Sequence, residues 1–154
     1  MITEFDDIDR RILVALQRDG RITNQDLAQS VHLSAAACSE RVKRLKERGA
    51  IASYTALLDP EVVGLPLMVF VEVSLDRTTS GAMRDFATAV QALPEVLECH
   101  MVAGGFDYLL KARVKDMAAY RILLGQTLVD MPGVRETRTY AVLEEVKYTT
   151  ELPI

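Results

Sequence analysis

The hydrophobic period of this 154-residue chain changes near residue 66, and the change divides the chain into two parts. Before it, apolar residues recur every three or four positions, which is typical of amphipathic helices. From Leu67 to Leu75 every second residue is apolar, which predicts a strand with one buried face. Asp59-Pro60 and Gly64-Leu65-Pro66 interrupt regular structure between the two patterns. We therefore expect a head over residues 1–50, a linking strand and hinge over 51–65, and a second domain over 66–154.

The second part has an order of predicted elements that few folds accommodate. The order is strand, helix, strand, strand, helix, strand, over residues 67–75, 80–93, 96–102, 106–114, 116–128 and 134–143. It predicts a ferredoxin-like βαββαβ domain, in which two helices cover one face of a four-stranded antiparallel sheet. Met68 and Phe70 fall on the other face. We therefore predict that this face packs against a second copy of the chain.

Residues 23–49 have the pattern of a helix-turn-helix. Thr23 and Ser34 are the expected N-caps of two helices, and Gly49 is the expected C-terminal stop. In such a motif the second helix enters the major groove of DNA. The sequence therefore predicts a DNA-binding head.

Two further elements complete the predicted head. A helix over residues 5–20, with Asp6 as its N-cap and Ile12 and Leu16 on its apolar side, should cover the helix pair. Residues 51–57 are expected to form an extended strand, which would make the head winged-helix-like. The whole chain is thus expected to be an α+β protein.

Charge supports the assignment of DNA binding to the head. Residues 34–50 hold five bases and two acids, a local charge of +3 in a chain of net charge −4. Residues 51–154 hold nine Lys and Arg against fourteen Asp and Glu, so only the head is expected to meet phosphate. The alternative is an ordinary helical hairpin whose basic side chains are merely solvated.

Within the second helix, the residue types favour different contacts with DNA. Small side chains stand at its N-terminal end, where base edges are usually met, and Arg41 and Arg44 are the candidates for bidentate base contacts. The remaining bases, Lys46 among them, are expected on phosphates. The DNA-binding residues that we predict are Ser34, Ala35, Ala36, Ser39, Arg41, Lys43, Arg44 and Arg48.

Several classes of protein are disfavoured. The chain has no apolar run of the roughly 18 residues needed to cross a membrane, and its acidic N-terminus is no signal peptide. Cys38 and Cys99 are too few for a disulfide framework or a zinc site. Neither His32 nor His100 has a nearby Cys or acid arranged with it as a nucleophile-base pair. No phosphate-binding or dinucleotide motif occurs. We therefore expect a cytoplasmic protein without a metal, cofactor or catalytic site.

A glycine-rich turn between the two middle strands is the candidate ligand site. In Gly104-Gly105-Phe106-Asp107-Tyr108 the glycines can adopt positive φ and leave backbone N–H groups open to a carboxylate. Asp107 is the acid there that could receive an ammonium group. The alternative is a plain hairpin turn with a surface aspartate.

The chain resembles the Lrp/AsnC (feast/famine) family of regulators over nearly its whole length, and most of all that family's leucine-responsive group. The segments that carry the resemblance are DDIDRRIL, DGRITNQDLA, LSAAACSERVKRLKERGAI, YTALLDP, ECHMVAGGFDYLLK, MAAYRILL and MPGVRETRTYAVLEEVK. The family often has a proline and a threonine where this chain has Ala35, Ala36 and Ala37. The alanines favour modest sequence preference and a response to DNA bendability.

The resemblance implies an amino-acid effector, leucine or another apolar one, bound between neighbouring dimers. It implies that dimers assemble further, often to octamers, and that they bend DNA in the nucleoid. The effector-binding residues that it implies are Gly104, Gly105, Phe106, Asp107, Tyr108, Met117, Gln126, Tyr140, Ala141 and Val142. The alternatives are an effector-independent nucleoid-type architectural protein and, further off, a decarboxylase of the same fold.

Overall fold

The computed structural model describes residues 5–77 and 79–154, with the side chain of Gln126 left out. The chain forms two compact units. The first holds the residues up to Leu57 together with the C-terminal residues Lys147–Ile154, and the second holds Leu58–Val146. Among the described residues, no helix is both long and apolar enough to cross a bilayer.

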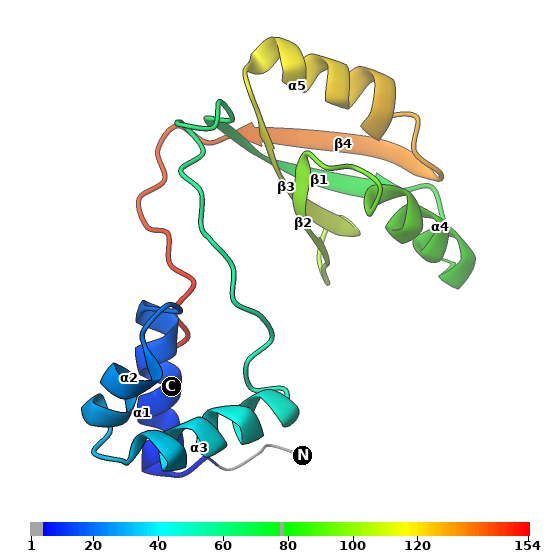
Figure 1. Cartoon of the computed structure of the whole chain (residues 1–154). Helices are drawn as coiled ribbons and strands as arrows, with labels where there is room; N and C mark the ends of the chain where they lie inside the picture. Colours follow the sequence, from blue (N-terminus) through cyan, green and yellow to red (C-terminus); the bar gives the residue numbers. More distant parts are fainter. Residues whose placement is uncertain (1–4, 78) are drawn as a thin grey trace. The chain divides into compact units, whose positions relative to one another are not determined.

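Three helices form the first unit: α1 (Asp7–Arg18), α2 (Asn24–Ser30) and α3 (Ala35–Glu47) (Figure 1). All three predicted N-caps are confirmed. The carboxylate of Asp6 accepts a hydrogen bond from the backbone N–H of Asp9 at 2.7 Å, and the hydroxyls of Thr23 and Ser34 accept from the N–H groups of Asp26 and Ala37. These side chains satisfy N–H groups that the first turn of a helix leaves without partners.

Helices α2 and α3 end in the same way. After α3, Gly49 has a φ of 74°, its N–H donates to the carbonyl of Lys46, and the N–H of Ala50 donates to the carbonyl of Leu45. This pair of bonds is a Schellman motif, as predicted for Gly49. After α2 the left-handed position is taken by His32, with a φ of 58°. Its N–H donates to the carbonyl of Gln29, and the next N–H donates to that of Ala28.

The core of the first unit is built where the three helices meet. Its most buried side chains are Ile12 on α1, Leu27 on α2, and Cys38 and Leu45 on α3. Burying an apolar side chain of this size contributes about 1.5–3 kcal/mol. Burial also raises the pKa of the Cys38 thiol, so that this cysteine behaves as a small apolar residue.

The strand predicted over residues 51–57 is wrong for the single chain, because the described residues 51–59 carry no strand. A strand needs a neighbour to pair its N–H and carbonyl groups, and a propensity for extended backbone does not supply one. The ring of Tyr54 instead lies against Gly20 and Lys46. A Cβ added to Gly20 would lie 3.3 Å from that ring, and the ammonium of Lys46 lies 4.8 Å from its centre.

The second unit confirms the predicted ferredoxin-like order. Its elements are β1 (Leu67–Leu75), α4 (Ser80–Val90), β2 (Val96–Met101), β3 (Tyr108–Val114), α5 (Met117–Leu123), the π-helical η1 (Leu124–Leu128) and β4 (Val134–Ala141). The sheet order is β2-β3-β1-β4, and all neighbouring strands are antiparallel. The helix predicted over 116–128 is therefore present, with its last turn widened to a π-helix.

One face of the sheet packs against both helices. Val69, Val71 and Val73 of β1 are fully buried together with Phe86 of α4 and with side chains of α5. The ring of Phe86 stacks on Tyr108 of β3 with 4.6 Å between the ring centres. Side chains alternate along a strand, so the residues between these valines belong to the opposite face of the sheet.

Candidate functional site

Helix α3 exposes the N-terminal residues that the sequence predicts to meet DNA. It buries Cys38 and Leu45, which lie two turns apart on one side. Most of the predicted DNA-contacting residues are exposed; these are Ser34, Ala35, Ala36, Ser39, Lys43, Arg44 and Arg48. Lys43 lies 4.0 Å from Glu47, one turn further along, and both side chains are well exposed. Because the N-cap Ser34 and the residues after it have small side chains, a DNA groove can approach the backbone at this end of α3 closely.

Arg41 and Arg44 are held by acids of α1. A terminal nitrogen of Arg41 (Nη1) donates to Asp6 at 2.6 Å and to Asp9 at 2.8 Å. Arg44 donates to both carboxylate oxygens of Asp9, at 3.3 and 3.4 Å. The Asp9 side chain is only 3% exposed. The two arginines thus tie α3 to α1, and a base contact by either would have to compete with these ion pairs.

Sequence reasoning missed these acidic partners, although a signal was present. Asp6 and Asp9 are three residues apart, as are Arg41 and Arg44. That spacing places each pair on one side of its helix, so two complementary charge pairs could have been matched. The backbone N–H of Asp9, followed by the guanidinium of Arg41, lowers the pKa of Asp6.

The turn of residues 104–107, the predicted ligand loop, is held in place by Asp107. A carboxylate oxygen (Oδ2) of Asp107 accepts the backbone N–H of Leu75 at 2.7 Å, and the N–H of Asp107 donates to the carbonyl of Val73 at 3.0 Å. These bonds fasten the β2–β3 turn to the end of β1. Neither Gly104 nor Gly105 uses the positive φ that glycine allows. The carboxylate anchor stabilises the turn, and open space surrounds both glycines.

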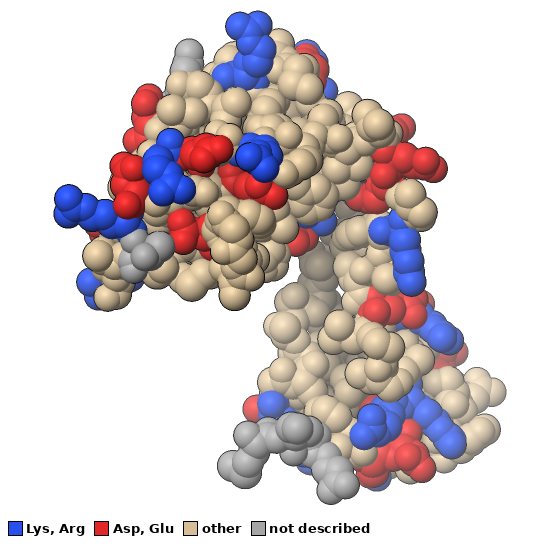
Figure 2. Space-filling model, turned by 180° about the vertical axis from the view of Figure 1, so that it is seen from behind, with Lys and Arg blue, Asp and Glu red and all other residues tan. Residues whose placement is uncertain are grey.

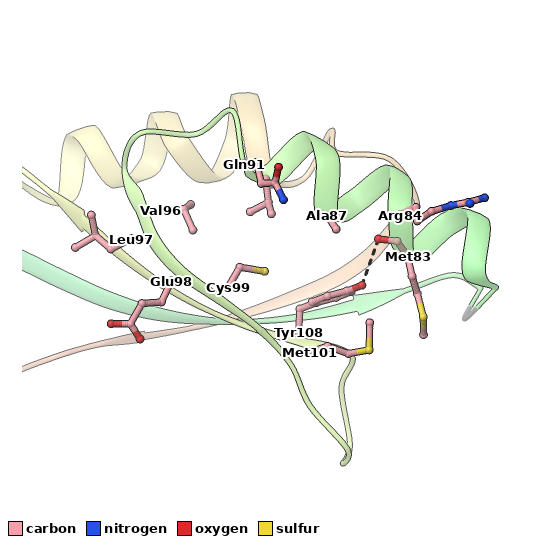
Figure 3. A pocket seen from close by; sticks show the side chains of 11 residues that line it. Met83, Arg84, Ala87, Gln91, Val96, Leu97, Glu98, Cys99, Met101 and Tyr108 are labelled. Atoms are coloured by element: carbon pink, nitrogen blue, oxygen red, sulfur yellow. Dashed lines mark hydrogen bonds between the residues drawn. The ribbon is translucent and has the colours of Figure 1, made fainter. Parts of the chain in front are cut away.

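Tyr108 points into the core of the second unit. Its ring packs on Phe86, its hydroxyl donates to the carbonyl of Met83 at 3.3 Å, and burial raises its pKa. It lies at one end of an open hollow of about 500 Å³ between α4 and strands β2 and β3. In Figure 3, Met83 and Met101 flank Tyr108, while Arg84 and Glu98 lie at opposite ends of the hollow.

A smaller, polar hollow of about 80 Å³ lies beside the ligand loop. Gly105 and Phe106 of the loop line it together with Glu72 and Ser74 of β1 and Glu136, Thr137 and Arg138 of β4. Charges of both signs therefore border one space. Such a border suits a zwitterion, whose carboxylate and ammonium groups need opposite partners.

The backbone of β4 at the other predicted effector residues lies away from this loop, although the hydroxyl of Tyr140 reaches Glu72, which lines the hollow beside the loop. Tyr108 pairs with Val73 and Ala141 pairs with Val69, four residues apart on β1, which separates the two pairs by about 13 Å along the sheet. Tyr140 donates its hydroxyl to Glu72 at 3.0 Å, and the N–H of Val142 donates to the carbonyl of Met68.

The last two predicted effector residues lie on the second helix of this unit. Met117 begins α5 and is exposed. The side chain of Gln126 lies outside the described part of the chain. The described residues contain no group of three or more His, Cys, Asp or Glu placed to hold a metal ion.

Comparisons with known proteins match both units. Residues 68–152 match the Lrp/AsnC ligand binding domain, and residues 5–52 match a winged helix-turn-helix DNA-binding family. The chain is 54% identical over 151 residues to the leucine-responsive regulatory protein of Escherichia coli strain K12, a match that covers 98% of this chain and 92% of that protein.

Solved structures agree over both units. The L-Met complex of a transcriptional regulator from Neisseria meningitidis matches with a TM-score of 0.93 and 42% identity, covering 97% of each chain. An AsnC family transcriptional regulator from Agrobacterium tumefaciens matches with a TM-score of 0.92 and 36% identity, again covering 97% of each chain.

Proposed function

Because this chain belongs to the Lrp/AsnC family of transcriptional regulators, we propose that α3 reads duplex DNA and that an apolar amino acid bound by the second unit changes how copies of the chain assemble on it. The chain is a regulator with a helix-turn-helix and an amino-acid-responsive ligand domain, and it is not an enzyme. We propose below which residues contact DNA, which amino acid binds, and how copies of the chain assemble.

The proposed DNA surface is the exposed side of α3 from its N-cap onward. Ser34, Ala35, Ala36 and Ser39 would face base edges, and Lys43 and Arg48 would contact phosphates. Arg41 and Arg44 stand beside this surface. Phosphate contacts of this kind make affinity fall steeply with salt. The site of action would be the nucleoid, in the cytoplasm.

The proposed ligand is leucine or a similar apolar amino acid. A relative is named leucine-responsive, and a similar regulator was solved as its L-Met complex. In this chain the Gly104–Asp107 turn and the mixed charges of Glu72, Glu136 and Arg138 would receive the two charged groups of the amino acid.

The single observation that carries the assembly proposal is the separation of the predicted effector residues. The ligand loop and the Tyr140–Val142 end of β4 lie about 13 Å apart along β1 in one chain. Because Ala141 and Val142 lie at the end of β4 that is far from the loop, we propose that a loop from one copy meets the β4 end of another. The ligand would then favour one assembly of dimers, such as an octamer, by its differential affinity for the two assemblies.

The experiment combines calorimetry with sedimentation. L-Leu and L-Met are titrated into the purified chain, with D-Leu and L-Asp as matched controls for chirality and side-chain charge. We expect L-Leu and L-Met to bind. We also expect their binding to change both the sedimentation coefficient of the chain and its affinity for a labelled duplex. Heat from none of the four, with DNA binding intact, would favour an effector-independent architectural protein. Binding without any change in assembly would overturn the proposed mechanism.

A further inference from the structure

The basic side of α3 is partly neutralised from within its own unit. Of the five bases in residues 34–50, Arg41 and Arg44 form ion pairs with Asp6 and Asp9 of α1. Counting these two carboxylates reduces the charge around α3 from +3 to +1. On the face of the molecule drawn in Figure 2, basic and acidic side chains are likewise interspersed.

These ion pairs are built into the packing of the helices. Asp9 is 3% exposed and Arg41 is 25% exposed, so water screens their 2.8 Å contact less than it would screen a surface pair. Asp6 adds a 2.6 Å contact to the same nitrogen of Arg41. Short, charge-assisted hydrogen bonds of this kind are about twice as strong as neutral ones.

A DNA contact by Arg41 would therefore be an exchange of one anion for another. Phosphate oxygens and guanine acceptors are the groups for which a free arginine has high affinity. In this chain the guanidinium already has two carboxylates, and the cost of removing the shorter of the two arginine contacts of buried Asp9 opposes the exchange. Lys43, on the outer side of the helix, has only the 4.0 Å contact with Glu47 to give up.

We propose that Asp6, together with buried Asp9, is a positioning residue that withholds Arg41 from duplex DNA, and that it thereby keeps the affinity and the base discrimination of the head modest. This inference rests on the proposed contact between α3 and DNA. Binding then depends on the small N-terminal residues of α3 and on the phosphate contacts proposed for Lys43 and Arg48. Releasing an arginine would add a contact that the native head does not make.

Asp6→Asn isolates this effect because it preserves the local structure. Asparagine caps helices as well as aspartate does, so the bond to the N–H of Asp9 remains. Asp7→Asn is the matched control. It makes the same change of charge one residue along, on an exposed residue that takes no part in the bonds that hold Arg41 in place. Asp6→Ser is a second variant, since serine also caps.

The measurement is duplex affinity by fluorescence anisotropy across a salt series, with thermal unfolding as the check on folding. Asp6→Asn and Asp7→Asn should both bind more tightly than the native chain, because each removes one negative charge. Asp6→Asn should in addition steepen the plot of log affinity against log salt by about one contact per head, roughly a 3-fold extra loss between 50 and 200 mM salt. The double variant Asp6→Asn/Arg41→Gln should return to the slope of Asp7→Asn.

The outcomes separate this inference from the proposed function. A native chain that leaves duplex DNA unbound at low salt overturns the proposed function itself. A native chain that binds, with Asp6→Asn and Asp6→Ser matching Asp7→Asn in affinity and slope, overturns only the withholding of Arg41. A gain that persists in the double variant also overturns it, because Arg41 would not be its source.

Discussion

Asp9 and Arg41 join α1 to α3 through a 2.8 Å contact between a carboxylate oxygen and a guanidinium nitrogen. The carboxylate is almost completely buried, and Arg44 approaches it from the next turn of α3. Asp9 therefore serves as the shared partner of two arginines. This contact links α1 to α3 in addition to the apolar core that they share.

We expect Asp9→Ala to destabilise the head by about 1–3 kcal/mol, because both arginines lose a buried acceptor. Asp7→Ala, on the exposed side of the same helix turn, is the control and should change stability by less than about 0.5 kcal/mol. Chemical denaturation followed by circular dichroism would measure both. Equal stability of the two variants would show that Asp9 contributes no more than a surface acid.

Two residues in left-handed backbone should respond to substitution in opposite directions. His32→Gly should stabilise the head by about 0.5–1 kcal/mol, since glycine has no Cβ that opposes a φ of 58°. Gly49→Ala should destabilise it by about 1 kcal/mol for the converse reason at a φ of 74°. Thermal unfolding of both variants tests the pair. The same sign of change in both would contradict the backbone argument.

Asp107 has a structural role and a proposed ligand role, and two substitutions separate them. Asp107→Ala removes the acceptor of the Leu75 N–H and should loosen the β2–β3 turn, which faster hydrogen exchange at Leu75 would report. Asp107→Asn keeps an acceptor oxygen and removes the charge. Both variants should bind DNA normally and lose the response to the amino acid. A normal amino-acid titration of Asp107→Asn would leave Asp107 with the anchoring role alone.

Tyr120 and Thr139 share a hydrogen bond between α5 and β4, next to the residues predicted to meet the effector. Tyr120→Phe should cost about 1–2 kcal/mol, because the hydroxyl of Thr139 then lacks its partner at a half-buried position. Thr139→Val should cost a similar amount. The double variant should cost clearly less than the sum, since both polar groups are then gone. Additive losses in this cycle would show that the two hydroxyls do not interact.

Glu98 gives the second unit a pH-dependent contribution to stability. Hydrogen bonds from Lys111 and then His100 lower its pKa. Its contribution is therefore complete above about pH 4.3, the ordinary glutamate value, and is lost as pH falls through the lowered native pKa. The difference in melting temperature between the native chain and Glu98→Gln should shrink on acidification below about pH 4.3. Glu144→Gln, which removes an exposed carboxylate, should show a difference that varies less with pH.

Short-range chemistry explains most of what could be predicted. Asp6, Thr23 and Ser34 act as N-caps because their side chains reach an N–H only three residues away, and this depends on local sequence alone. The alternation of β1 likewise predicted which side chains face the core. The DNA-contacting and effector-binding roles stay predictions, since no partner molecule is described.

The expectation that proved wrong depended on partners distant in sequence. Residues 51–57 form no strand because the described chain offers them no neighbouring strand. The turn that holds Gly104 and Gly105 is likewise fastened by a distant partner, since Asp107 accepts the N–H of Leu75 on β1. Neither relationship can be read from a window of a few residues.

By itself, the sequence determined the order of the elements, the helix caps, the helical head, and which side chains of each strand share a face of the sheet. It could do so because periodicity and capping act within a few residues. Only the tertiary structure decided that Arg41 and Arg44 bind acids of α1, and that the predicted effector residues divide between two ends of one sheet. Charges separated by more than thirty residues meet only when helices pack, and distances across a sheet are set only when its strands take their register.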